Sequence, residues 1–418
     1  MKIFLLIASL ISSALGEKYA VLVAGSKDIW NYRHQSDVCH SYHVLINHGF
    51  DPKNIILFSY DDIPNSPENP IPGTLYNKPG NNSVNVNKGC VKDYTGKEVT
   101  SENFLNVIQG KKEAMQGKGS EKVLESTAED QVFISFVDHG SSGVIAFPND
   151  FLFAHELIDA LKEMHTQKMY QKLVFFIEAC ESGSMFEGKL PDNIEVYGMT
   201  AADATQSSFA AYCPPNDVVN GVKIGSCLGD LFSVSWMENA DQVNINTETL
   251  EQQYKVVKNR TFRSNVSKYG SMSFISDPVG EFLGTQSSKA LGASPVVSNN
   301  WESRDNKLHY LYNKYMEHSN WENAQEIMAE LMKRERQHSV FEKFSRAILV
   351  DSPGHLMSER MLPMNTVCLK EAISAYHESC GQFDDYGMKF IQVLANACEL
   401  EVPQSKIADA FYKICSFE

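Results

Sequence analysis

Two continuous apolar runs stand out along the chain, and each ends abruptly in reactive side chains. The first, residues 132–137, leads into His139, and the second, residues 173–177, leads into Cys180. An apolar run without alternation predicts a strand buried on both faces, which is typical of a parallel sheet covered by helices. Because ligands bind beyond the carboxyl ends of such strands, we expect a functional site at this edge of the sheet.

Other apolar segments extend this pattern into an α/β arrangement. The spacing of apolar positions predicts strands at 19–25, 54–59 and 194–200 and helices at 33–48, 101–108 and 154–164. Strands and helices that alternate with short connections predict a mostly parallel sheet flanked by helices. Residues 61–93 are polar and rich in Pro, Gly and Asn, which predicts a surface excursion at the border of a cleft.

The two ends of the chain depart from the α/β pattern. Residues 1–16 carry a basic start, a short apolar core and small terminal residues, which predicts a secretory signal peptide. Small and polar residues predict a linker over 286–320, and helical periodicity predicts a separate all-α domain over 321–418. The α/β domain is therefore expected at 17–285.

Charge and composition restrict the partners of this chain. It has 418 residues, a formal net charge of −15 at pH 7 and a sequence pI of about 5.3. This acidity argues against nucleic acid or an anionic membrane surface as a partner, and it suits an acidic compartment. Beyond the signal peptide, no stretch approaches the roughly 20 apolar residues that a membrane span requires.

Cys180 and His139 form the candidate reactive pair. They lie about 40 residues apart, a separation that suits neighbouring parallel strands joined by a helix. A thiol beside an imidazole makes a nucleophile and its base, and Gly140 and Gly183 free backbone amides for a developing oxyanion. Taken singly, a cysteine in this position is more often a packed small hydrophobe, and a histidine at a strand end is more often structural.

Six short motifs, in their order and spacing from about residue 19 to 283, resemble those of legumain, the asparaginyl endopeptidase. They are Asn31-Tyr32-Arg33-His34-Gln35, Tyr60-Asp61-Asp62-Ile63, Lys92-Asp93-Tyr94-Thr95-Gly96, Asp138-His139-Gly140, Glu178-Ala179-Cys180-Glu181-Ser182-Gly183-Ser184 and Leu228-Gly229-Asp230-Leu231. The resemblance implies a caspase-like version of the parallel sheet. The helical tail is similar to the legumain prodomain, mainly through its cysteines.

The resemblance implies a mechanism for the reactive pair. The Cys180 sulfur attacks a peptide carbonyl, His139 protonates the leaving amine, and turn amides including that of Gly140 stabilise the oxyanion. Water then hydrolyses the thioester. Asn31 matches the position that orients the catalytic histidine, whereas its sequence context alone equally suits a helix-capping asparagine.

The resemblance also implies a pocket for an asparagine side chain, which offers one acceptor and two donors. The matching pocket positions are Arg33, Glu178 and Asp230, with His34, Ser207 and Ser208 in the same region. A pocket of mixed charge rejects apolar side chains and accepts a protonated aspartic acid, so cleavage after Asp is expected to grow as pH falls. In the family, the position of Asp138 is a possible site of succinimide formation.

Nine cysteines on a secretory route favour disulfides. Cys213 and Cys227 flank a Pro-rich loop, and we expect them to pair. The tail holds Cys368, Cys380, Cys398 and Cys415, which allow three pairings. The resemblance to the prodomain favours Cys368 with Cys398 and Cys380 with Cys415. Cys39 is interpreted as a candidate buried thiol, and the partner of Cys90 stays open.

A protease with a long helical tail is expected to be made as a zymogen. The simplest hypothesis is that residues from about 321 cap the cleft. Asn320 aligns with the legumain activation site, and Asn299 and Asn300 are rival cleavage sites. Basic residues of the tail, such as those of the run 333–336, are expected to pair with carboxylates around the cleft, and acid would loosen these pairs.

Modification sites and partners complete the sequence predictions. Asn81, Asn259 and Asn265 lie in Asn-x-Ser/Thr sequons and are candidate glycosylation sites. No metal and no organic cofactor are expected. The expected partners are protein and peptide substrates, the chain's own prodomain as an inhibitor, and cystatin-type inhibitors. The expected location is a lysosome- or vacuole-like acidic compartment or the extracellular space.

Three functions remain open from the sequence. The first is a cysteine endopeptidase that cleaves after asparagine. The second is a peptide ligase, in which an amine instead of water resolves the thioester at Cys180. The third is a non-catalytic secreted binding protein that retains the fold, against which the reactive pair and the pocket charges argue.

Overall fold

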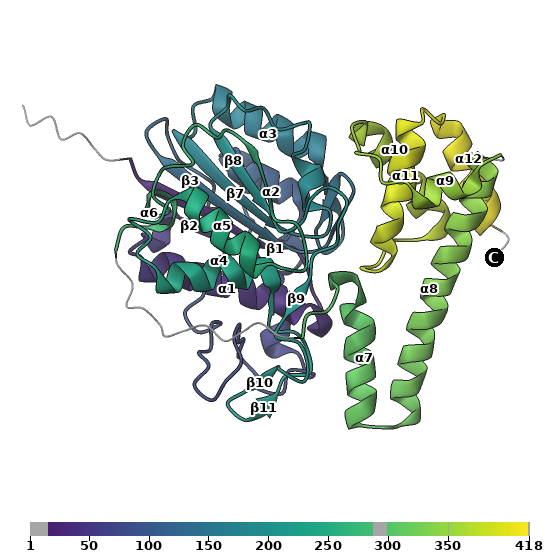
Figure 1. Cartoon of the computed structure of the whole chain (residues 1–418), viewed down its shortest axis with the longest axis horizontal. Coiled ribbons are helices and arrows are strands. Elements are labelled where there is room, and N and C mark those ends of the chain that lie inside the picture. Colours follow the sequence, from purple (N-terminus) through teal and green to yellow (C-terminus); the bar gives the residue numbers. More distant parts are fainter. Residues whose placement is uncertain (1–15, 287–298, 350, 417–418) are drawn as a thin grey trace, which may run out of the picture.

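A central six-stranded sheet organises the α/β domain (Figure 1). The computed structural model describes residues 16–286, 299–349 and 351–416, so the predicted signal peptide lies outside it apart from Gly16. The strands are β1 (Lys18–Ala24), β2 (Ile55–Ser59), β3 (Gln131–Val137), β7 (Lys172–Glu178), β8 (Val196–Thr200) and β13 (Ser267–Gly270). Their spatial order is β13-β8-β7-β3-β1-β2, and every neighbouring pair is parallel except β13 with β8.

Helices cover both faces of this sheet, which explains why its central strands are apolar without alternation. One face carries α1 (Tyr32–Asn47), α4 (Leu231–Gln242), α5 (Leu250–Arg260) and the short α6 (Gly280–Leu283), and the other carries α2 (Ser101–Ile108) and α3 (Ala154–Thr166). Trp236 anchors the first core and Phe104 the second. The predicted fold class, a mostly parallel sheet flanked by helices, is confirmed.

Short strands form sheets of two or three strands outside the central sheet. They are β4 (Gly140–Ser141), β5 (Val144–Ala146), β6 (Phe151–Phe153), β9 (Ala210–Ala211), β10 (Val218–Val219), β11 (Val222–Lys223) and β12 (Gly229–Asp230). These strands and the antiparallel strand β13 were not predicted from the sequence, because strands of two to four residues carry too little periodicity to be recognised.

The C-terminal part is helical, as predicted. It consists of α7 (Asn306–Glu317), α8 (Trp321–Ile348), α9 (Pro353–Ser358), α10 (Thr366–Cys380), α11 (Ile391–Glu399) and α12 (Gln404–Cys415). Figure 1 shows α7 and α8 as an antiparallel pair, with the far end of α8 packed among α9 to α12. Val144 and Phe153 of the β5–β6 hairpin share one apolar cluster with Phe341 of α8, so the two parts dock through a common core.

Candidate active site

The two reactive segments meet because their strands are in register. Val137, the last residue of β3, lies opposite Glu178, the last residue of β7, so the residues that follow lie at one edge. The Asp138 amide donates to the Glu178 carbonyl at 3.1 Å. A Cβ atom on Gly140 would lie 2.4 Å from the Cys180 carbonyl oxygen, so only glycine allows this close approach of the two segments.

Cys180 is fully buried, and it is the one cysteine that forms no disulfide among the nine, all of which the structure describes. Its sulfur lies 3.3 Å from the Ser208 amide nitrogen and 3.6 Å from the Ser208 hydroxyl. Burial raises the pKa of the Cys180 thiol to about 11, against the opposing effect of the Arg304 guanidinium. In this closed form the thiol is therefore protonated and poorly nucleophilic.

His139 is held by Asn31, as the sequence analysis expects for a catalytic histidine. Asn31 Oδ1 lies 2.9 Å from His139 Nε2 and accepts its proton, while His139 Nδ1 is buried and without a hydrogen-bond partner. Asn31 stands at the N-cap position of α1 but makes no capping hydrogen bond. The helix-cap alternative is therefore wrong. With its proton on Nε2, His139 has an unprotonated Nδ1 that can accept a proton.

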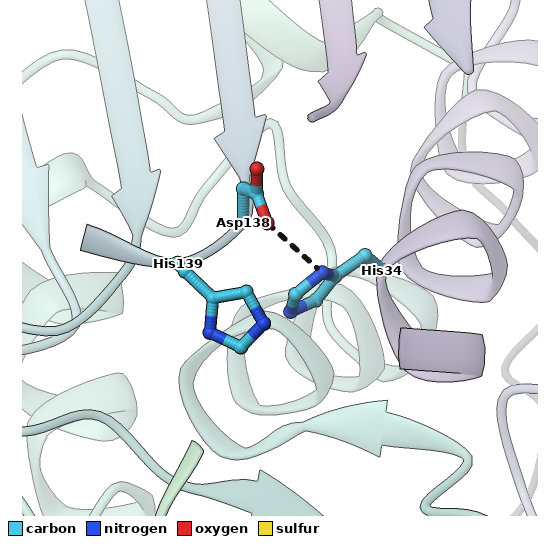
Figure 2. A group of neighbouring side chains, drawn as sticks. All are labelled: His34, Asp138 and His139. Carbon is cyan, nitrogen blue, oxygen red and sulfur yellow. Dashed lines mark ion pairs between the residues drawn. The ribbon is translucent and has the colours of Figure 1, made fainter. Parts of the chain in front are cut away.

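His34 and Asp138 form a second layer beside His139 (Figure 2). His34 Nδ1 lies 2.6 Å from the Ser26 hydroxyl and 3.4 Å from Asp138 Oδ1, and the two histidine rings meet edge to face with centroids 5.2 Å apart. Burial lowers the pKa of His34 far below its usual range and raises the pKa of Asp138 to about 7. Burial therefore favours the neutral form of both side chains.

The same three side chains have the composition of a metal site, since one ligand atom from each of His34, Asp138 and His139 lies within 4.8 Å of the others. Ser26 and Asn31 already bond the two histidines through ring nitrogens. We therefore assign the cluster to positioning of His139, and the expectation that no metal takes part stays a prediction.

A buried arginine forms the floor of the expected specificity pocket. The Arg33 side chain is fully buried, and its Nε donates to Asp230 Oδ1 at 2.8 Å. Glu178 Oε2 accepts from the amide and hydroxyl of Ser233, at 2.9 and 3.1 Å. Burial raises the pKa of Glu178 and of Asp230, with Arg33 opposing both shifts. Arg33 and Asp230 are therefore not surface charges, and one cation faces two carboxyl groups.

The linker crosses this site as an extra strand. The Ser303 amide donates to the Ser208 carbonyl at 3.1 Å, and the Ala210 amide donates to the Trp301 carbonyl at 2.8 Å. The Ser303 hydroxyl lies 3.1 Å from that of Ser208. Residues from about 321 therefore do not cap the cleft alone, because the segment beside Cys180 belongs to the expected linker.

Beside this strand, Ser207 is occupied by the linker as well, because its hydroxyl donates to Glu302 Oε1 at 2.6 Å. Asn306, the first residue of α7, places its amide on Arg33. When the amide is oriented with its oxygen toward the guanidinium, this oxygen lies 3.1, 2.8 and 3.2 Å from Nε, Nη1 and Nη2 of Arg33. Asn306 is buried. An asparagine side chain thus fills the expected pocket.

Arg304 places a positive charge beside the reactive pair. Its guanidinium donates to the Glu181 carboxylate and to the Gly140 carbonyl, the latter at 3.2 Å. The predicted pairing of the basic run 333–336 with cleft carboxylates is wrong for its described pairs. Lys333 pairs with Asp384 within the tail, and Arg334 pairs with Glu330 and with the linker residue Asp305.

The helical domain adds a carboxylate beside Nε2 of His139. Asp385 Oδ2 accepts from Trp30 Nε1 at 3.0 Å and from Asn31 Nδ2 at 3.2 Å, and it lies 3.4 Å from His139 Nε2. A cavity of about 450 Å³ remains between the two parts, lined by His139, Asp385 and neighbouring residues. The reactive pair is therefore covered from two directions, by the linker and by the helical domain.

Comparison with known proteins agrees with this arrangement. Residues 18–285 match the peptidase C13 family, and residues 323–415 match the legumain prodomain. Legumain from Mus musculus is 39% identical over 414 residues, which cover 96% of this chain and 93% of the relative. The chain belongs to the legumain family. A vacuolar-processing enzyme from Vicia sativa is 36% identical over 438 residues, with coverages of 96% and 86%.

As a legumain-family member, the chain is a cysteine endopeptidase with a helical prodomain. Among solved structures, caspase-1 from Spodoptera frugiperda is 12% identical with a TM-score of 0.37, and the match covers 66% of this chain and 92% of the caspase. Among the described residues, no helix is both long and apolar enough to cross a membrane.

Four disulfides tie this legumain-family chain together. Cys213 pairs with Cys227, Cys368 with Cys398 and Cys380 with Cys415, which are the pairs that the sequence analysis expects. The fourth pair, Cys39 with Cys90, corrects the interpretation of Cys39 as a buried thiol. Four disulfides are typical of a chain that passes through the secretory pathway.

The Cys39–Cys90 bond is expected to stabilise the peptidase domain. It joins α1, which carries Arg33 and His34, to the surface excursion 61–93 across a sequence separation of 51 residues. Closing a loop of this length stabilises a fold by up to about 4 kcal/mol through the unfolded state. We expect the double variant Cys39→Ala/Cys90→Val to show a lower Tm by differential scanning calorimetry and a smaller response to reductant. An equal loss of Tm on reduction of both proteins would contradict this role.

Several residues of the site escaped the sequence analysis. Asp37 lies one helical turn after Arg33, and its Oδ2 accepts from the Asp230 amide at 3.0 Å. The spacing of four residues on one helix face was an available signal. Arg304, Asn306 and Asp385 carried no local signal, because their roles arise only when distant segments dock on the cleft.

The predicted modification and processing sites are accessible. Asn81, Asn259 and Asn265 are exposed, in keeping with glycosylation, which stays a prediction. Asn320 is exposed at the turn between α7 and α8, where its side chain caps α8 by accepting from the Asn323 amide at 2.8 Å. Asn299 is also exposed, whereas Asn300 is half-buried.

Proposed function

We propose that this chain is the zymogen of an endopeptidase that cleaves peptide bonds after asparagine, with Cys180 as nucleophile and His139 as acid and base. The observation that carries the specificity is the Asn306 side chain on Arg33. Its oxygen accepts from the guanidinium at 2.8–3.2 Å, while Asp230 holds the other side of Arg33. A substrate asparagine can make the same bonds, and Glu178 would accept from its amide N–H groups.

In the proposed reaction, His139 and Asn31 prepare the thiol. Asn31 fixes the Nε2 proton of His139, so bare Nδ1 takes the proton of Cys180 and later gives it to the leaving amine. The tetrahedral oxyanion would accept from backbone amides, including that of Gly140. Departure of the linker would rehydrate Cys180, which lowers its pKa toward the usual value and makes the thiolate available.

The function is tested with peptides that differ only before the scissile bond. Acid-matured enzyme is expected to cleave after Asn at pH 5.5 at least about 100-fold faster than after Ala or Lys. Cleavage after Asp should rise as pH falls toward 4, because the protonated carboxyl resembles the amide. An added amine nucleophile distinguishes hydrolysis from ligation by mass spectrometry. Equal cleavage after Asn and Ala would refute the proposed pocket.

We further propose that the linker and the prodomain keep the enzyme inactive together. Residues 301–303 occupy the strand position of a substrate beside Ser208, and Arg304 covers Glu181. A cut at Asn320 alone would leave this strand in place. The fully active enzyme is therefore expected to have a second cut near Asn299 or Asn300, at the start of the occupied stretch.

The acid response of the closed form follows from two groups at the prodomain contact. Burial alone would raise the pKa of Asp385, but His139, Asn31 and Trp30 outweigh it and hold this pKa well below its usual range. Burial lowers the pKa of His155, whose Nδ1 lies 2.9 Å from the Thr366 hydroxyl.

Each group changes the stability of the closed form over its own pH range and in a definite direction. Ionised Asp385 stabilises the closed form fully above the usual carboxyl pKa of about 4. This stabilisation is lost as pH falls from there through the lowered pKa of Asp385 in the closed form. Closure loses stability at His155 as pH falls through about 6.5, because the open form binds that proton more tightly. Glu181 has the opposite sign, since burial raises its pKa and the closed form binds its proton more tightly. Acid opening is therefore expected from His155 first and from Asp385 at lower pH.

Replacing Asp385 with asparagine is expected to speed maturation. The variant replaces the carboxylate that accepts from Trp30 and Asn31 beside His139 with a neutral amide, so the prodomain should dissociate more readily at pH 5–6, where wild-type Asp385 is still charged. We expect maturation about five- to tenfold faster, measured as loss of the full-length mass over time. Asp409→Asn, on the exposed face of α12, is the matched control. Maturation of Asp385→Asn at the rate of this control would remove Asp385 from the inhibitory contact.

A further inference from the structure

The linker shows where the residue after a cleaved bond would lie. Ser303 bonds the Ser208 carbonyl through its amide, and the Ser208 amide contacts the Cys180 sulfur at 3.3 Å. Trp301, two residues earlier, bonds Ala210 in the alternating pattern of an antiparallel strand pair. The backbone of Ser303 therefore occupies the strand position of the residue before the scissile bond, while the Asn306 side chain fills the pocket of that residue. Arg304 follows in the position of the residue after the bond.

At that second position the protein offers two acceptors. Glu181 directly follows Cys180, and Gly140 directly follows His139. The Arg304 guanidinium donates to the Glu181 carboxylate and to the Gly140 carbonyl, and it is only 6% exposed. An arginine side chain, with several N–H donors in one plane, satisfies both acceptors at once.

Both acceptors belong to the peptidase domain, and contacts within that domain hold their backbones in place. Glu181 is 3% exposed and has a left-handed backbone, with φ of 47°, and its amide donates to the Gln206 carbonyl at 2.7 Å. Gly140 is fixed against the Cys180 carbonyl, where no Cβ fits. When the linker leaves, the carboxylate and the carbonyl remain at the reactive pair without the donor that now satisfies them.

We propose that Glu181 makes the mature enzyme prefer peptides with arginine or lysine immediately after the cleaved asparagine. This inference rests on the proposed asparagine-specific cleavage and adds a second determinant on the other side of the scissile bond. An incoming amine in a ligation reaction would occupy the same position, so an amino-terminal arginine would be favoured there as well. A substrate with glutamate at this position would place two carboxylates together and bind poorly.

The preference should depend on the charge of Glu181. In the closed form the charged groups that act on this carboxylate are Arg304, Arg360 and Glu302, and the carboxylate itself raises the pKa of the neighbouring Cys180 thiol. The first three leave with the linker and prodomain. In the mature enzyme the preference for a cation is therefore expected above about pH 4.5, the usual glutamate value, and it should fade below that pH.

The test uses enzyme matured in acid from the full chain and four peptides, identical except for Arg, Lys, Gln or Glu after the asparagine. At pH 6 we expect kcat/KM for Asn-Arg and Asn-Lys to exceed that for Asn-Gln about tenfold, with Asn-Glu lower still. In Glu181→Gln the Arg/Gln ratio should fall to about 1, and in Glu181→Lys the order should reverse in favour of Glu. Glu187→Gln, an exposed charge six residues away, is the control that should keep the wild-type ratio.

The possible outcomes test the arginine preference separately from the proposed asparagine-specific cleavage. Cleavage of Asn-Gln with an Arg/Gln ratio near 1 in the wild type would overturn the inference and leave asparagine specificity intact. An unchanged ratio in Glu181→Gln would also overturn it. If the Glu181 variants fail to mature, the wild-type ratio between pH 6 and 4 decides, because a constant ratio contradicts a role for this carboxylate. Failure to cleave any asparagine peptide would overturn both proposals.

Discussion

Cys180→Ala is expected to lose peptide cleavage and self-processing together, with kcat/KM lowered at least about 10⁴-fold. The sulfur is the only group placed to attack the substrate carbonyl in the proposed mechanism, and the methyl group of alanine cannot replace it. Thermal unfolding should change little, because the thiol makes only weak contacts with Ser208. The measurement is hydrolysis of an asparagine peptide, with the mass of the chain followed in acid.

The same variant shows how the activation cut is made. Asn320 is separated from the cleft by the 12 residues of α7, a length of about 18 Å, so it cannot reach the Cys180 of its own chain without unwinding. A trace of mature wild-type enzyme should therefore cut Cys180→Ala at Asn320, at a rate proportional to the enzyme added. Residual self-cleavage of pure Cys180→Ala would exclude this cysteine as the nucleophile.

Arg33→Lys is expected to lower kcat/KM for asparagine peptides at least about 100-fold. The guanidinium now donates through Nε to Asp230 and through Nη1 to Asn31 at 3.1 Å, and it faces the Asn306 amide. A lysine ammonium keeps the charge but cannot hold these partners in one plane. Asp230 and Asn31 would lose donors in a buried site, so both the pocket and the orientation of His139 should suffer.

The Asn/Ala selectivity and the Tm of Arg33→Lys show whether the variant has lost the pocket. Rates after Asn and after Ala should move closer together, and Tm should fall because a buried carboxylate is left with a poorer partner. Arg346→Lys, on the exposed end of α8, is the matched control and should leave both quantities unchanged. Wild-type selectivity in Arg33→Lys would show that another group recognises the asparagine.

Much of the catalytic end of the sheet could be predicted from local patterns. Buried parallel strands are recognisable because both faces must be apolar, and the site follows at their carboxyl ends. This reasoning placed His139 and Cys180 on neighbouring strands, and the register of β3 with β7 confirms that placement. The helical tail was predictable for the same reason, since its apolar positions follow the helical period.

The state of the zymogen was decided by tertiary structure alone. The cleft is closed by Arg304 and Asn306 of a segment whose composition suggested only a linker, and by Asp385 of the prodomain. None of these residues has a sequence neighbour that explains its role, because each acts on a charge more than 100 residues away in the chain. Sequence periodicity reports which face of an element is buried, whereas pairing between distant charges depends on how the elements dock.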